Sequence, residues 1–95
     1  MFYTYVLRSD RDQRFYTGTT RDLRARVALH AAGEIRSTVN RRPLTLVYYE
    51  ACLNIDDAYR RERYLKTGKG KRYLRNRLAA SFVGTANRLE HRKMQ

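Results

Sequence analysis

The sequence predicts an α+β fold in which a small three-stranded antiparallel sheet is flanked by helices, in the order β-β-α-β-α-α. Residues 2–8 and 14–17 are rich in aromatic and β-branched side chains and are separated by a polar turn, which is typical of a β-hairpin. Residues 21–32 have the apolar spacing of a helix, and residues 44–49 form a third strand-like run. Because sheets and helices must cover each other's apolar faces, this pattern favours one sheet with helices packed against it.

Length and charge restrict the class of protein. With 95 residues there is room for one small core, so we expect one domain over residues 1–80 and a basic tail over residues 81–95. Residues 1–57 contain nine Lys/Arg and seven Asp/Glu, whereas residues 58–95 contain twelve and two. Such a positive field favours a phosphate-rich partner, although charge alone is equally compatible with a soluble basic protein.

Cysteine content and hydropathy indicate where the protein works. The single cysteine, Cys52, follows an apolar run and is expected to be a small buried hydrophobic residue in a reducing compartment. No apolar run approaches the ~18 residues that a membrane span needs, and Met1 leads directly into a strand pattern without a signal peptide. The sequence therefore predicts a cytoplasmic protein that does not bind membranes.

The first helix has clear start and stop signals. The strand before it is expected to end at Gly18, a natural kink, and Thr20 is a candidate N-cap. Asp22 then lies in the first turn, where the helix dipole favours an anion. Gly33 follows at the position where helices often end. We therefore expect a helix over residues 21–32.

The region after this helix divides into a loop and a strand. Residues 34–43 are polar and basic without an apolar period, and we expect a loop. Pro43 disfavours helix at the residue before it. Residues 44–49 have so few polar positions that they are predicted to be the central strand, paired with the hairpin.

A second helix is predicted from Asn54, as N-cap, to Lys66. Ala58, Glu62 and Leu65 recur at the spacing of a face that is turned toward the core. Glu62 is thus a carboxylate in an inward stripe, and it is the only acid in a span, residues 60–77, with nine Lys/Arg. It should stay ionised in that environment.

A third helix is predicted over residues 71–80, because Gly68 and Gly70 are expected to break the chain between the two helices. Its apolar spacing suggests a buried side. The residues expected on that side are Tyr73, Leu74, Arg77 and Leu78.

Chemically active side chains converge near the first helix. Arg26 and His30 are four residues apart, so a guanidinium and an imidazole project from one helix face beside Tyr16 at the end of the hairpin. Each has a structural alternative: Arg26 as a solvated arginine, His30 as a partner of the helix dipole, and the tyrosines as core aromatics. Glu62 could likewise pair with Arg61 or Lys66.

Taken together, these residues resemble the signature of the GIY-YIG nuclease superfamily. Tyr3-Thr-Tyr5 and Tyr16-Thr-Gly18 correspond to its two tripeptides, although Tyr3 replaces the first glycine and Thr17 an isoleucine. The resemblance covers residues 2–78 and is closest to small stand-alone bacterial members. Those members also have a Ser-Thr-x-Asn-Arg-x-Pro loop and an Arg-Glu-x-x-Leu-Lys-x-Gly-x-Gly segment, here residues 37–43 and 61–70.

The resemblance implies that water hydrolyses a DNA phosphodiester with one divalent ion, Mg²⁺ or Mn²⁺, held by Glu62. A lone carboxylate suits Mg²⁺, which keeps most of its waters. Tyr5 or Tyr16 would orient or deprotonate the water, with the phenol pKa lowered by Arg26, and the resemblance favours Tyr5 as the base. Arg26 would also contact phosphate oxygens, and His30 would accept the tyrosine proton or donate to the phosphate. The later asparagine of the family could match Asn76. The expected catalytic residues are Tyr5, Tyr16, Arg26, His30 and Glu62.

Several other polar side chains are expected to contact the DNA backbone, which gives affinity without sequence choice. They are Arg24, Ser37, Asn40, Arg41, Lys66, Lys69, Lys71 and Arg72, with Arg75 beside them. The predicted function is therefore a metal-dependent DNA endonuclease, with repair or branched DNA as candidate substrates. The alternative is a nucleic-acid-binding module that has kept the scaffold with weak or no turnover.

Overall fold

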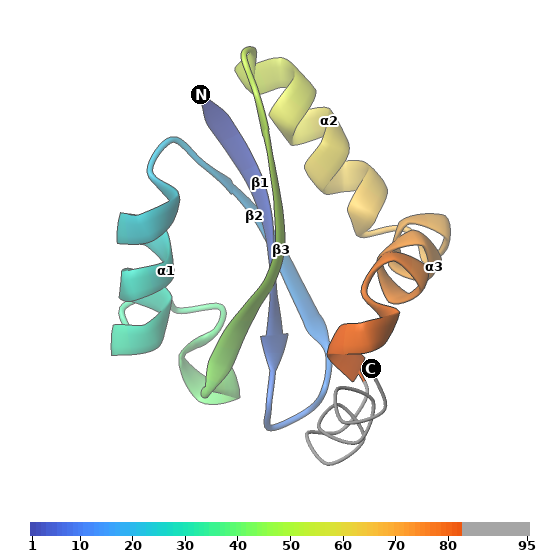
Figure 1. The fold of residues 1–95 in the computed structure, drawn as a ribbon. Coiled ribbons are helices and arrows are strands. Elements are labelled where there is room, and N and C mark those ends of the chain that lie inside the picture. The colour runs from blue at the N-terminus through green and yellow to red at the C-terminus, as the bar shows by residue number, and fades with distance from the viewer. Residues whose placement is uncertain (83–95) are drawn as a thin grey trace, which may run out of the picture.

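The computed structural model describes residues 1–82, and in this part of the chain a three-stranded antiparallel sheet is packed between helices (Figure 1). The element order β-β-α-β-α-α and the α+β class are confirmed. The elements are β1 (Phe2–Ser9), β2 (Phe15–Thr20), α1 (Leu23–Ala32), the 3-10 helix η1 (Val39–Arg41), β3 (Leu44–Cys52), α2 (Ile55–Leu65), α3 (Gly68–Arg77) and the 3-10 helix η2 (Ala79–Phe82). The expected basic tail, residues 81–95, lies outside the described residues except for its first two positions.

The sheet order is β2-β1-β3, so the prediction that residues 44–49 form the central strand was wrong. β1 is central, and four consecutive residues, Thr4 to Leu7, are buried on its two faces. In β3 every position is half-buried or exposed, and Tyr49 is 55% exposed. The apolar run of residues 44–49 led to the wrong strand order because β3 is an edge strand. The unpaired backbone groups along a sheet edge leave no pattern in the side chains of that strand.

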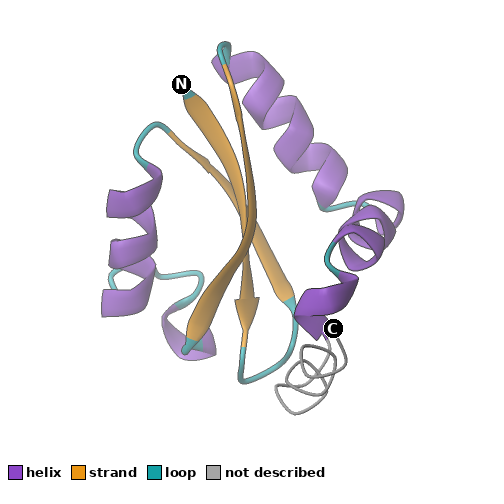
Figure 2. Cartoon of the chain, viewed as in Figure 1, coloured by secondary structure: helices purple, strands orange, loops and turns teal. Residues whose placement is uncertain are grey.

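Helices cover the two faces of the sheet, with α1 on one face and α2 and α3 on the other (Figures 1 and 2). Because side chains alternate along a strand, neighbouring residues of β1 serve opposite layers. Val6 packs with Leu65 of α2 and Leu74 of α3 in the fully buried core. Tyr5 and Leu7 face α1, and this layer contains the buried His30.

The start of α1 differs from the prediction. β2 continues through Gly18 to Thr20 without a break, and α1 begins at Leu23. The N-cap is Asp22, whose carboxylate accepts a hydrogen bond from the Ala25 backbone at 3.0 Å, whereas the Thr20 hydroxyl contacts only the backbone of Asp22. The predicted end is confirmed: Gly33, with φ 81°, follows Ala32.

The second helix begins as predicted, because the Asn54 side chain accepts from the Asp56 backbone at 2.8 Å. Ala58 and Leu65 are buried, which confirms the inward stripe. Cys52, expected to be buried, is half-buried at the end of β3, with its thiol against the carbonyl of Asn54.

The third helix begins three residues before the predicted start. Thr67 caps α3 by accepting from the Gly70 backbone at 3.1 Å, and both glycines lie inside the helix. Gly70 has a packing role, since a side chain there would collide with the backbone of Tyr64 and Leu65 in α2. Arg77, predicted on the buried side, is exposed because α3 ends at that residue. No helix in residues 1–82 is long and apolar enough to cross a membrane.

Candidate active site

Tyr5 lies in the central strand and reaches across the neighbouring strand. Its register partner in β2 is Gly18, and a methyl group on Gly18 would come within 2.6 Å of the Tyr5 hydroxyl oxygen. The absence of a side chain at Gly18 therefore gives the Tyr5 ring its path over β2. This replaces the expectation that Gly18 breaks the strand: the glycine is needed for a close approach inside an unbroken ladder.

The Tyr5 hydroxyl is joined to a buried chain of hydrogen bonds. It lies 2.8 Å from Nε2 of His30, and Nδ1 of the same ring lies 2.7 Å from the Thr38 hydroxyl. That hydroxyl donates to the Ile35 carbonyl at 3.5 Å, so it is placed to accept from Nδ1–H. Nε2 is then left to accept the Tyr5 proton. All three side chains are at most 1% exposed, and burial, aided by the charge of Arg26, lowers the pKa of His30.

Arg26 and Tyr16 complete this cluster on the α1 face. The rings of Tyr16 and His30 lie edge to face, with centroids 5.1 Å apart, and those of Tyr5 and Tyr16 are 6.4 Å apart. The guanidinium of Arg26 interacts with both phenols, and its pKa is raised first by the Tyr5 hydroxyl. Within residues 1–82 its buried Nε has no hydrogen-bond partner. A buried donor in this state is suited to a ligand oxygen.

Arg26 was expected to lower the pKa of the Tyr5 phenol, and this expectation is correct for the single interaction but wrong for the net shift. Arg26 lowers the pKa of Tyr5, but burial acts more strongly in the other direction, so this pKa is raised above its ordinary value of 10.0. Electrostatic interactions with Tyr16 and with Glu62 raise the pKa of Tyr5 further. Tyr5 is therefore a neutral hydroxyl at neutral pH.

Glu62 lies on α2, on the other side of β2, and does not contact the two phenols. One carboxylate oxygen accepts from the Thr19 hydroxyl of β2 at 2.7 Å, and the other accepts from Nζ of Lys66 at 2.8 Å. The structural alternative of a Glu62–Lys66 pair is thus realised. The carboxylate side chain is 19% exposed and the lysine 55%, so the ammonium can leave without disturbing packing.

The oxygen atoms around Glu62 fit a hard divalent cation. No group of three or more His, Cys, Asp or Glu suited to a metal occurs in residues 1–82, so an ion here would have one protein carboxylate, with the Thr19 hydroxyl beside it. Mg²⁺ tolerates this because it keeps several waters and takes other ligands from phosphate. The Lys66 ammonium marks a position on Glu62 where a cation is stable.

The predicted DNA-contacting residues are spread over several surfaces. Arg24 is exposed on α1, and Ser37 and Asn40 are exposed around η1. Arg41 is half-buried and paired with Asp12 at 3.0 Å, which gives it a structural role. The remaining exposed cations, all in or near α3, are Lys66, Lys69, Lys71, Arg72 and Arg75.

Two hydroxyl residues of the site, Thr38 and Thr19, were missed at the sequence level. Thr38 lies in a polar loop, and nothing in its spacing indicates that it is 0% exposed against His30. Thr19 follows Gly18 in a strand, where threonine is common for conformational reasons alone. Tyr3, which replaces the family's glycine, is half-buried edge to face with Tyr49, and Asn76 is exposed on α3.

The chain is similar in sequence to a known family of proteins. The family model described as the GIY-YIG catalytic domain matches residues 1–77. The UPF0213 protein SH2523 of Staphylococcus haemolyticus is 41% identical over 66 residues, covering 68% of this chain and 79% of the relative. A UPF0213 protein of Pediococcus acidilactici, named for the ldhD 5′ region, is 41% identical over 81 residues, covering 79% and 82%. The solution structure of the UPF0213 protein BH0048 from Bacillus halodurans is 30% identical, with a TM-score of 0.49 and coverage of 93% and 92%.

Proposed function

Because this chain belongs to the GIY-YIG family, whose catalytic domain implies a nuclease, we propose that it is a metal-dependent endonuclease that hydrolyses DNA phosphodiester bonds. The observation that carries the proposal is the hydrogen-bonded chain from Tyr5 through His30 to Thr38 beside the unpartnered Nε of Arg26. A buried phenol whose proton already points at a neutral imidazole is arranged for proton transfer at a reacting atom.

The proton of the attacking water would move in a relay. Tyr5 accepts this proton on its hydroxyl oxygen while its own proton passes to Nε2 of His30, and the water oxygen forms the new bond to phosphorus. The bond from phosphorus to the leaving sugar oxygen breaks, and that oxygen takes up a proton from solvent. His30 then returns its proton through the Tyr5 hydroxyl. This route fits the raised pKa of Tyr5, because the phenol is never required to be ionised before the reaction.

Arg26 would contact the phosphate at its non-bridging oxygens. Its planar guanidinium can hold two oxygens at once, and the free Nε is one of the donors for this contact. The negative charge that grows on these oxygens during attack is then offset in a half-buried position, where electrostatic stabilisation is stronger than in water. Tyr16, whose ring packs beside both Tyr5 and His30, would keep the hydroxyl of Tyr5 in line.

Glu62 would hold one divalent ion, Mg²⁺ or Mn²⁺, on the α2 side of β2. When bound, such an ion polarises the phosphate and stabilises charge on the oxygens that it contacts. Lys66 must leave the carboxylate for this to happen, and its exposed side chain can then move to a neighbouring phosphate. We further propose that the phosphate backbone supplies most of the affinity, that repair or branched DNA is the substrate and that the protein works in the cytoplasm.

The proposal is tested by incubating flapped, nicked and branched DNA with the full chain and Mg²⁺ or Mn²⁺, beside Glu62→Gln and Glu34→Gln. Glu34 is an exposed residue of the loop after α1, so its variant controls for the lost charge. We expect cleavage by the wild type and Glu34→Gln and at least a roughly 100-fold lower rate in Glu62→Gln. Equal rates in Glu62→Gln and the wild type would refute the assigned metal ligand.

A second candidate function is a nucleic-acid-binding module without useful turnover. The observation in its favour is the ion pair of Lys66 with Glu62, which occupies the carboxylate of the expected metal site. Salt-sensitive binding of DNA, with no cleavage of any substrate in either metal ion, would favour this alternative over the nuclease.

A further inference from the structure

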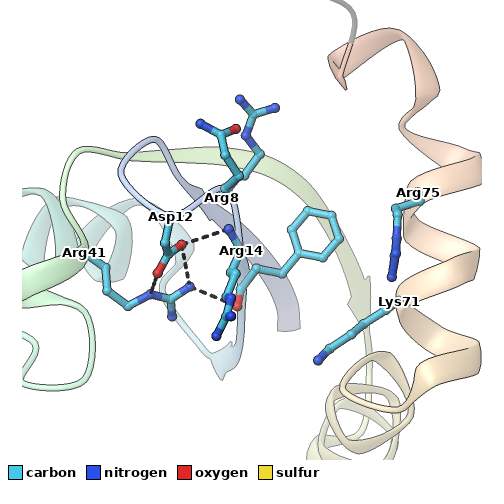
Figure 3. Close-up of a pocket in the computed structure, with 8 residues that line it drawn as sticks. Arg8, Asp12, Arg14, Arg41, Lys71 and Arg75 are labelled. Carbon is cyan, nitrogen blue, oxygen red and sulfur yellow. Dashed lines mark hydrogen bonds and ion pairs between the residues drawn. The ribbon is translucent and has the colours of Figure 1, made fainter.

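A basic hollow of about 920 Å³ lies at the opposite end of β2 from Glu62, between the β1–β2 turn and α3 (Figure 3). In Figure 3, Lys71 and Arg75 extend from α3 on one side, and Arg14, Asp12 and Arg41 lie on the other. The volume is in the range of natural ligand pockets. The hollow is thus a defined concave site, separate from the cluster around Tyr5.

The wall of the hollow formed by the turn is held by hydrogen bonds. The fully buried Ser9 hydroxyl accepts from the backbone of Asp12 at 3.2 Å and donates to the carbonyl of Arg41 at 2.6 Å. The Asp12 carboxylate accepts from Nε of Arg41 at 3.0 Å and from the Arg14 backbone at 2.8 Å. The guanidinium of Arg41 also donates to the Phe15 carbonyl at 3.3 Å. The turn and η1 therefore form one rigid support.

The charge balance of the hollow selects for an anion. Its lining contains five cations, Arg8, Arg14, Arg41, Lys71 and Arg75, and one carboxylate, Asp12, which is already paired with Arg41. Lys71 and Arg75 are exposed and one helical turn apart, so both can reach the same ligand. Several cations that converge on one concavity are typical of phosphate binding.

The position of the hollow relative to the candidate active site identifies the ligand. Arg8 pairs with Phe15 in the β1–β2 ladder, and Tyr5 pairs with Gly18 three residues further on. At about 3.4 Å per residue, the hollow lies roughly 10 Å from the Tyr5 position along β2. A fully stacked nucleic acid strand rises ~3.4 Å per nucleotide along its axis, so this distance corresponds to at most about three nucleotides, and to fewer in an extended strand.

Resting on the proposed nuclease function, we propose that this hollow is a second phosphate-binding site that anchors the substrate strand within about three nucleotides of the bond to be cut. The outer edge of β2 has no strand partner within residues 1–82 and runs from the hollow to the candidate active site. The strand lies along this edge, with one phosphate at Arg26 and others between the turn and α3. The ligand is a polynucleotide, because a continuous strand can place one phosphate at Arg26 and others in the hollow at the same time.

The test compares two double variants that remove the same charge. Lys71→Gln with Arg75→Gln changes the hollow, whereas Arg63→Gln with Arg77→Gln changes exposed residues of α2 and α3 that do not line it. Both are made in the full chain carrying Glu62→Gln, and binding is measured by fluorescence anisotropy in chelator. The probes are single-stranded oligonucleotides from two to about eight nucleotides long, with pyrophosphate and a nucleoside triphosphate as free competitors.

We expect affinity to rise once the oligonucleotide is long enough to reach both positions. The hollow variant should bind these longer oligonucleotides roughly tenfold more weakly than the parent protein, whereas the control variant should bind them as well as the parent does. The dependence of log affinity on log salt should fall by about 1.4 in the hollow variant, as expected for two lost contacts to a single strand. Equal losses in both variants would overturn the proposal, as would full competition by the free nucleotide. Because binding is measured without turnover, the proposed nuclease function can fail while the anchor site stands, and the reverse.

Discussion

The two sides of β2 hold the halves of the candidate active site in opposite ways. On the α1 side, Tyr5, His30 and Thr38 are sealed from solvent and joined by hydrogen bonds of 2.7–2.8 Å. On the α2 side, Glu62 is partly exposed and its charge is balanced by the mobile ammonium of Lys66. The α1 side of β2 thus holds a neutral cluster fixed by hydrogen bonds, and the α2 side holds a charged carboxylate whose cationic partner can be exchanged.

This difference indicates which groups of the proposed reaction are already in position before a substrate binds. Proton transfer needs donors and acceptors within a fraction of an ångström, and burial with complete hydrogen bonding supplies that precision. In the proposed reaction a metal ion and a phosphate must enter and leave, so their ligands need access to solvent. We therefore expect substitutions on the α1 side to alter the rate of the chemical step and substitutions on the α2 side to alter the requirement for metal.

The largest effect is expected from Tyr5→Phe, which keeps the ring over Gly18 and removes the hydroxyl. Losing a positioned proton acceptor should lower kcat by about 10²–10⁴-fold. It also leaves Nε2 of His30 without its partner, which should lower the free energy of unfolding by about 1–3 kcal/mol. Single-turnover cleavage and urea unfolding measure the two effects. Tyr49→Phe, an exposed tyrosine of β3, should change neither, and a similar loss there would argue against a special role of Tyr5.

Thr38→Val should have a smaller effect on the same side. Removing the acceptor of His30 Nδ1 weakens control of the imidazole tautomer, and a bond worth about 1 kcal/mol corresponds to a roughly fivefold lower kcat. Thr38→Ser restores the hydroxyl and should restore kcat, which a purely steric role of the threonine would not require. The exposed Thr45→Val is the matched control.

Lys66→Gln tests the exchangeable side. An exposed ion pair contributes about 0.2–1 kcal/mol, so removing the competing ammonium should lower the Mg²⁺ concentration for half-maximal cleavage by roughly 1.5- to 5-fold. Titration of cleavage against Mg²⁺ measures this shift, with Lys69→Gln as the control for charge. A higher metal requirement in Lys66→Gln than in Lys69→Gln would contradict the idea that lysine and metal compete for Glu62.

The smallest expected effect is a pH dependence of stability from His30. Its folded-state pKa lies below the ordinary 6.5, because burial disfavours the imidazolium. The unfolded chain therefore takes up this proton first as the pH falls. The contribution is fully present above about 6.5 and is lost as the pH falls toward the folded pKa. Urea midpoints measured from neutral to acid pH should fall less steeply in His30→Gln than in the wild type, and parallel curves would exclude His30 as a cause.

The secondary-structure elements could be predicted from the sequence more accurately than the contacts between them. The hairpin, the helix end at Gly33 and the Asn54 cap could be found because local chain chemistry determines them. The position of β1 at the centre could not, because strand order depends on which backbone edges pair, and side chains do not encode this locally. Gly70 was interpreted as a helix breaker because its contact with α2 is a property of the packed structure.

The same distinction holds for the candidate site. The residue types of the cluster were predicted from spacing and resemblance, and the structure brings four of the five together, namely Tyr5, Tyr16, Arg26 and His30. Burial reversed the expected pKa shift of this phenol, because desolvation outweighs one neighbouring guanidinium. The role of Thr38 was missed because a loop hydroxyl becomes informative only when its partner, eight residues earlier, is known to turn toward it.

The contact of Gly70 with the backbone of α2 has a consequence for the length of the products. With no side chain between them, α2 and α3 are in van der Waals contact at the turn and cannot slide past each other. The carboxylate of Glu62 on α2 and the cations of the hollow on α3 are therefore a fixed distance apart. A strand whose end is held in the hollow would be cut at a constant offset from that end and would give one product length, whereas a strand held at internal phosphates would be cut at many positions.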